Sequence, residues 1–144
     1  MTKPQLLFDS NVIYWLIREM PDTAVDRLIE GYTINLAYYE LGNALWRECL
    51  LLKKISLEEA QKSLGLMYAI LEKMQITPID SDTGAEVLEV AYKFSLTFYD
   101  SAYLTEAKEN GKTLITDDNK LAKAAEKIGV KTLSSQVLLK QFSS

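Results

Sequence analysis

The chain of 144 residues carries 16 lysine and arginine residues against 20 aspartate and glutamate residues, so its formal net charge is −4. That balance excludes binding to polyanions by bulk charge alone, and the single cysteine, Cys49, excludes an intramolecular disulfide and a cysteine-rich zinc site. The absence of histidine excludes a Ser-His-Asp triad, a Cys-His pair and histidine-ligated metals, so any catalysis would rest on carboxylates, hydroxyls, lysine, arginine or tyrosine.

The first half of the chain predicts short buried strands that alternate with helices. Asp9 stops an apolar run, which is typical of a buried strand followed by a helix cap. The helix after it is apolar nearly all round, so we expect it to be deeply buried or to share a face with a partner. Gly31 is expected at the C′ position of the second helix. The expected elements are a strand at 5–8, helices at 12–20 and 23–30, a strand at 33–36 and a helix at 38–52.

The second half continues the alternation. Ser56 and Glu59 have the spacing of a capping box, in which each side chain bonds the other residue's backbone amide. Ser81 or Asp82 is expected to cap the helix after the third strand. The expected elements are a helix at 57–74, a strand at 76–79, helices at 83–94 and 97–110, a strand at 113–116, a helix at 119–128, a strand at 130–133 and a final helix capped by Ser134.

This order of elements predicts a three-layer α/β/α fold with a short, mainly parallel central sheet of four to five strands. Neither a linker nor an internal repeat interrupts residues 1–144, so we expect one domain. The longest apolar run, 12–17, is far too short to span a membrane. A free cysteine and no signal-peptide pattern favour a cytoplasmic location.

Acidic residues follow three of the predicted strands. Asp9 directly follows the first strand, Glu40 lies a few residues after the second, and Asp117 and Asp118 directly follow the fourth. Ligands of open parallel sheets bind beyond the carboxyl ends of the strands, so these side chains are expected at one edge. Massed carboxylates repel one another unless cations neutralise them, and hard oxygen ligands suit Mg²⁺ or Mn²⁺. Such an ion can activate water for hydrolysis of a phosphodiester.

Each acid also has an ordinary local interpretation, and these alternatives stay open. Asp9 is a good N-cap, and Glu40 can be a solvated helix residue. Asp100 can complete a capping box begun by Thr97, and the pattern does not place it relative to the sheet. Asp117 and Asp118 can be a cap and a first-turn acid that complements the helix dipole.

Four segments, in this order, resemble the four acidic motifs of PIN-domain ribonucleases, and most closely those of VapC-type toxins from prokaryotic toxin–antitoxin pairs. They are LFDSNVI at 7–13, YELGNAL at 39–45, TFYDSAY at 97–103 and LITDDNKL at 114–121. The likeness covers nearly the whole chain. It implies a PIN-like fold and a Mg²⁺- or Mn²⁺-dependent endoribonuclease.

The resemblance also assigns roles to residues. It makes Asp9, Glu40, Asp100 and Asp118 the catalytic acids, and Asp9, Asp100 and Asp118 the metal ligands. Asn11 and Thr116 would orient these carboxylates by hydrogen bonds. Asp117 occupies a variable position of the fourth motif but is also acidic, so the choice between it and Asp118 stays open.

Candidate partners follow from the same resemblance and from the basic residues. Candidate contacts to RNA phosphates are Arg18, Lys120 and Lys123, and Arg47 is a further one. A solvated helix surface explains these basic residues equally well. The family association implies a homodimer and a small antitoxin whose segment covers the site. Trp15, Trp46 and the Tyr38-Tyr39 pair are candidate contacts, although a place in the core explains each of them singly.

Two other functions compete with a toxin-like nuclease. One is a non-catalytic PIN-like binding module, and the other is a PIN nuclease that processes RNA without acting as a toxin. A receiver-type phospho-acceptor domain fits poorly, because Asp9 is followed by Ser10 and Asn11 rather than by a second acid. Metal binding and the effect of Asp9→Asn on cleavage separate the nuclease from the binding module.

Overall fold

A computed structural model describes residues 3–142 of the chain. Its centre is a five-stranded sheet in the order β3-β2-β1-β4-β5, in which every neighbouring pair is parallel. The strands are β1 (Leu6–Phe8), β2 (Tyr32–Ile34), β3 (Gln75–Thr77), β4 (Thr113–Ile115) and β5 (Thr132–Leu133). The predicted parallel sheet is confirmed, with strands that are slightly shorter than the apolar runs in the sequence.

Helices connect the strands, as the sequence pattern predicts, and their bounds are close to the expected ones. They are α1 (Ser10–Glu19), α2 (Pro21–Ile29), α3 (Leu36–Trp46), α4 (Leu57–Leu71), α5 (Ser81–Phe94), α6 (Phe98–Glu109), α7 (Asn119–Lys127) and α8 (Ser135–Phe142). The helix expected at 38–52 changes character near its end, because α3 gives way to a π-helical turn, η1 (Arg47–Leu51). Among the described residues, no helix is long and apolar enough to traverse a bilayer.

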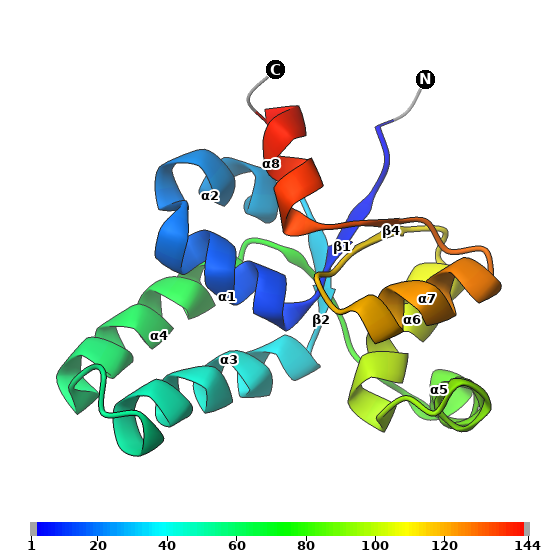
Figure 1. The fold of residues 1–144 in the computed structure, drawn as a ribbon, viewed down its shortest axis with the longest axis horizontal. Coiled ribbons are helices and arrows are strands. Elements are labelled where there is room, and N and C mark those ends of the chain that lie inside the picture. Colours follow the sequence, from blue (N-terminus) through cyan, green and yellow to red (C-terminus); the bar gives the residue numbers. More distant parts are fainter. Residues whose placement is uncertain (1–2, 143–144) are drawn as a thin grey trace.

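The sheet separates two apolar cores, which establishes the three-layer architecture (Figure 1). Successive side chains of a strand point to opposite faces. Phe8 of β1 therefore packs with α1, α2, α3 and α4, whereas Leu7 packs with α6 and α7 on the other face. The nearly apolar α1 is buried within the first core through Val12, Ile13 and Leu16, so burial inside the chain accounts for its composition.

One local prediction needs correction, and another is confirmed in position but not in backbone conformation. The N-cap of α5 is Asp80, not Ser81 or Asp82, because its carboxylate accepts the backbone amides of Asp82 and Thr83 at 3.0 Å. Gly31 follows the C-cap Glu30 and so lies at the predicted C′ position of α2, but its φ is not in the left-handed region. It is needed for space instead, since a Cβ at this position would lie 2.6 Å from the Phe8 ring. The predicted capping box of Ser56 and Glu59 is confirmed at the start of α4.

Candidate active site

The topology brings four acids to the carboxyl edge of the sheet. Asp9 follows β1, Asp118 follows β4, and Glu40 lies in α3, which follows β2. Asp100 arrives from α6. Because α6 ends near the amino edge of the sheet, where β4 starts, its N-terminal turn lies at the carboxyl edge, beside the other acids. Electrostatic interactions link Asp9 to Glu40 and Asp100, and Asp100 to Asp118.

Asp9 is the most buried of these acids, with 6% of its surface exposed. Its Oδ1 accepts the backbone N–H of Asn11 at 3.2 Å, which makes Asp9 the N-cap of α1, and its Oδ2 accepts the Thr116 hydroxyl at 2.9 Å. Burial raises the pKa of Asp9 from 3.8 to about 6, against the lowering effect of these two bonds, and the charges of Glu40 and Asp100 raise it further. The two hydrogen bonds thus hold the ionised carboxylate in place, but they do not offset the cost of burying its charge near other acids.

Glu40 is anchored by two hydroxyl groups. Its Oε1 accepts the Ser10 hydroxyl at 3.0 Å and the Tyr103 hydroxyl at 2.7 Å. Burial nonetheless raises the pKa of Glu40, and the Asp100 charge adds to the rise. Burial also raises the pKa of Tyr103, which is almost completely enclosed, so the phenol is a permanent donor to the carboxylate.

Sequence reasoning assigned no role to Ser10 or Tyr103, although both lie within the acidic motifs. The position of each residue relative to a predicted acid could have identified it. Ser10 is adjacent to Asp9, and Tyr103 lies three residues after Asp100, where α-helical spacing puts it on the same face of α6.

Asp100 lies in the first turn of α6. Its backbone N–H donates to the Thr97 side chain at 3.0 Å, so Thr97 is the N-cap of the helix. This is one half of the capping box considered above. Burial, followed by the Asp118 charge, raises the pKa of Asp100, and Lys120 opposes the shift. Lys120 is the basic candidate that interacts with the acids.

The two consecutive aspartates have different surroundings. Both oxygens of Asp117 are engaged by Ser135, which donates its backbone N–H at 2.8 Å and its hydroxyl at 2.7 Å at the start of α8. Asp118 caps α7 by accepting the Leu121 N–H through Oδ1 at 3.0 Å. Asp118 also interacts electrostatically with Asp100. The surroundings therefore favour Asp118 over Asp117 as the fourth acid.

The predicted orienting residues both contact Asp9, but by different routes. Thr116 uses its hydroxyl, which also accepts the Asp118 backbone N–H at 3.1 Å and so connects two acids. Asn11 uses only its backbone amide. Its side chain lines an open groove of about 820 Å³ together with Ser10 and Glu40.

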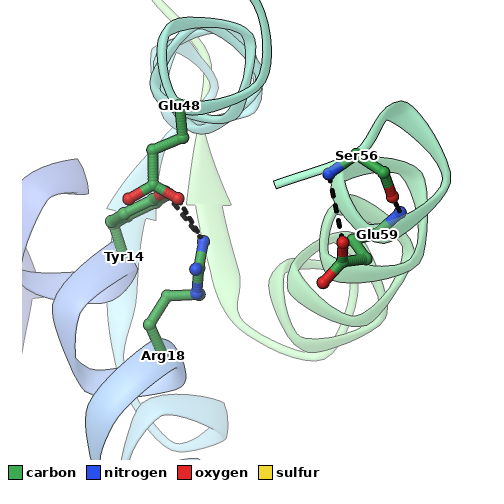
Figure 2. A network of polar contacts seen from close by, with 5 residues as sticks. All are labelled: Tyr14, Arg18, Glu48, Ser56 and Glu59. Carbon is green, nitrogen blue, oxygen red and sulfur yellow. Dashed lines mark hydrogen bonds and ion pairs between the residues drawn. The ribbon is translucent and has the colours of Figure 1, made fainter. Parts of the chain in front are cut away.

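Arg18, a candidate RNA contact, lies in the last turn of α1, at the other end of the helix from Asp9. Its guanidinium donates to Glu48 at 2.8 Å and to the Tyr14 hydroxyl at 2.9 Å, and it stacks over the Tyr14 ring (Figure 2). These contacts satisfy the Arg18 charge locally and link α1 to η1. Lys123 is exposed, one turn of α7 beyond Lys120.

The site carries excess negative charge in a partly dry environment, and its donors are hard oxygen atoms. Within residues 3–142, no three acidic side chains converge tightly enough to ligate one ion directly. Mg²⁺, however, keeps several water molecules and takes one or two protein carboxylates. The donor set therefore fits a hydrated divalent cation.

Comparisons with known proteins agree with this fold. Residues 6–127 match the model of the PIN domain. Two similar proteins from Pyrobaculum aerophilum are the exonuclease VapC9, 37% identical over 90% of this chain and 92% of its own length, and the ribonuclease VapC3, 32% identical over 72% and 78%.

The solved structures show the same architecture. A crystal structure of PAE2754 from Pyrobaculum aerophilum has a TM-score of 0.78, with 27% identity and 97% coverage of both chains. The structure of FitAB bound to a DNA fragment has a TM-score of 0.68, with 20% identity over 91% of this chain and 95% of that one. The chain belongs to the PIN-domain family, in the branch that contains the VapC proteins.

Proposed function

We propose that the protein is a metal-dependent endoribonuclease of the VapC type, which hydrolyses RNA phosphodiester bonds at the carboxyl edge of the sheet. One observation carries the proposal: four acids from separate segments interact there, and three of them have raised pKa values. A stable fold gains nothing from such repulsion, whereas a cation-dependent site requires it. The names of VapC9 and VapC3 support nuclease chemistry.

The acids of the site would have separate roles in metal binding and proton transfer. Asp9, Asp100 and Asp118 would hold Mg²⁺ or Mn²⁺, directly or through water, and Glu40 would accept a proton from the attacking water. When bound, the ion would lower the pKa of water and neutralise charge on the phosphate. Thr116 would keep Asp9 and the Asp118 backbone in register, and the Ser10 and Tyr103 hydroxyls would fix Glu40.

Cleavage of end-labelled RNA in Mg²⁺, Mn²⁺ and EDTA tests the proposal. Activity is expected only with the metals, with 5′-phosphate products if water is the nucleophile. Asp9→Asn and Asp100→Asn should each lower the rate at least a hundredfold. Asp26→Asn is a matched control, because Asp26 is exposed in α2 and the exchange changes the net charge equally. Equal rates in Asp9→Asn and wild type would contradict the proposal. A circular RNA, which has no ends, separates endonuclease from exonuclease action.

The partners are part of the same proposal. Structures similar to this chain include VapBC from Salmonella typhimurium and FitAB, both bound to DNA. This chain exposes apolar side chains where α3, η1 and α4 meet, namely Trp46, Leu50, Leu51, Leu52 and Leu57. Such a patch is typical of a protein interface. We expect a homodimer that also binds a small antitoxin. Light scattering of the protein alone, and purification with the product of a neighbouring small gene, test the two expectations.

A further inference from the structure

A narrow cavity lies between the sheet and helices α5 and α6, apart from the four acids of the candidate active site. The two helices pack against each other (Figure 1), and the carboxyl ends of β2 and β3 complete the cavity wall. None of the four acids lines the cavity, whose volume is about 30 Å³. One water molecule needs about 10–15 Å³. The cavity therefore admits a group the size of water or a thin chain, and it excludes a ring.

The surface inside the cavity is mainly apolar. Aliphatic side chains from the ends of both strands and from both helices line it, namely Ile34, Ile79, Val87 and Ala102. A wall of this kind favours the burial of methylene groups and offers no ligands to a metal ion. The wall therefore favours an organic ligand with an aliphatic part.

One polar group that lines the cavity has no partner. Thr105 of α6 is 2% exposed, and its hydroxyl has no hydrogen-bond partner among the described residues. The buried hydroxyl of Ser101, one turn earlier, donates instead to the Val87 carbonyl at 2.6 Å. Native proteins rarely leave a buried hydroxyl unpaired, because the loss of its hydration is then not compensated. The Thr105 hydroxyl is therefore available to a polar group that enters the cavity.

The same face of α6 carries negative charge into the cavity through Glu106 and Glu109. The Glu106 charge is balanced, because the Lys112 ammonium lies 2.9 Å from its carboxylate. Glu109 is exposed, and none of the ion pairs between the described residues involves it. The neighbouring Glu86 side chain, through a hydrogen bond and through its charge, raises the pKa of Glu109. A cation beside Glu109 would relieve this excess of negative charge.

We propose that the cavity binds a linear primary aliphatic amine, whose ammonium group donates hydrogen bonds to the Thr105 hydroxyl and the Glu109 carboxylate while its methylene chain lies against the aliphatic wall. Thr105 and Glu109 are four residues apart in α6, so their side chains are neighbours and one ammonium can contact both. A primary ammonium has three donors and is about as large as a water molecule. The inference does not depend on the proposed nuclease function, since no acid of that site lines the cavity.

The wild-type protein and three small ligands test the inference. Labelled with nitrogen-15, the protein is titrated with n-butylammonium chloride at pH 7 and constant ionic strength, and the amide chemical shifts are followed. Saturable shifts are expected at Val87 and Thr105. The alcohol n-butanol has a chain of the same length but no charge, and tert-butylammonium has the same charge but is too wide for the cavity. Each of these two should bind about tenfold more weakly or worse.

Substitutions separate the two contacts of the ammonium. Thr105→Val keeps the shape of the side chain but removes the hydroxyl, so n-butylammonium should bind about tenfold more weakly. Thr105→Ser retains the hydroxyl and should bind like wild type. Glu109→Gln should weaken binding about two- to fivefold, because this contact is exposed to water. Glu72→Gln is the matched control, since Glu72 is exposed at the end of α4, which packs on the other face of the sheet.

Two results would overturn the inference. If n-butanol or tert-butylammonium binds as tightly as n-butylammonium, or if Thr105→Val binds like Thr105→Ser, the cavity does not recognise a linear ammonium. If n-butylammonium leaves the amides of Val87 and Thr105 unchanged, the partner of the Thr105 hydroxyl is water alone. The cleavage of RNA enters neither comparison, so the nuclease proposal is tested separately.

Discussion

Asp9→Asn is expected to stabilise the metal-free protein while abolishing its activity. The rise of the Asp9 pKa from 3.8 to about 6 means that the folded state disfavours the ionised carboxylate by about 3 kcal/mol. Asparagine removes that charge and remains a good N-cap for α1. The Thr116 hydroxyl, however, loses its acceptor, which costs about 1 kcal/mol. At pH 8 in EDTA we therefore expect a gain of about 2 kcal/mol in the free energy of unfolding.

The gain should depend on pH with a definite sign. Because the folded pKa of Asp9 lies above the unfolded value, the folded wild type binds the proton more tightly, and its stability falls as the pH rises from about 4 through 6. The asparagine of the variant has no proton to lose. The advantage of the variant over wild type should therefore shrink by about 2 kcal/mol between pH 8 and pH 4.5. Asp26→Asn, on the exposed side of α2, should show neither the gain nor the pH dependence.

Added Mg²⁺ should reverse the order of stability. A ligand that binds only the folded state stabilises it by about 2.7 kcal/mol at a concentration of 100 Kd, and this gain is expected for wild type alone. Urea unfolding followed by circular dichroism, at two pH values and with or without Mg²⁺, measures all three effects. A variant less stable than wild type at pH 8 in EDTA would refute the electrostatic reasoning, because it would mean that the Asp9 charge contributes to folding.

Four further substitutions separate the roles of individual side chains. Tyr103→Phe removes a hydrogen bond that lowers the pKa of Glu40. When the rate of RNA cleavage is measured between pH 5 and pH 9, the pH at which it reaches half its maximum should therefore be higher than in wild type. Asp118→Asn should reduce cleavage at least tenfold with little change in urea unfolding, whereas Asp117→Asn should preserve cleavage and cost about 1 kcal/mol of stability through the start of α8. Ser56→Ala should cost about 1 kcal/mol in urea unfolding, by loss of the capping box of α4, and leave the cleavage rate unchanged.

The sequence predicts the layers and the sheet of this fold well, because both depend on local signals. Short apolar runs mark the strands, and the Ser56 capping box marks the start of α4 to the residue. The Asp80 cap differs from the prediction by a local shift of one residue, whereas two other features depend on a distant side chain. Gly31 is required by the Phe8 ring, which lies more than twenty residues earlier in the chain. The π-helical turn after Trp46 places Glu48 where it pairs with Arg18 of α1.

The position of Asp100 shows what topology adds to pattern. Two helices separate β3 from β4, so the spacing of apolar residues alone cannot tell which edge of the sheet α6 starts from. A parallel sheet supplies the missing constraint, since the helix before β4 has to return the chain to the amino edge. Its first turn, with Asp100, therefore lies among the other acids. The same argument places Tyr103, one turn later, beside Glu40.

The two interpretations of the acids, as helix caps and as site residues, prove compatible. Asp9 and Asp118 each cap a helix through Oδ1, and both belong to the interacting group of acids. A parallel strand that leads into a helix puts the N-cap at the carboxyl edge of the sheet, so a capping carboxylate there is already aimed at the ligand position. Local sequence cannot distinguish the roles because one geometry serves both. For Asp9, burial and the neighbouring charges distinguish the two roles, and for the exposed Asp118 the neighbouring Asp100 charge does so. Asp80 is an N-cap that also accepts backbone amides but lies exposed to water, whereas Asp9 is buried and acted on by two neighbouring acids.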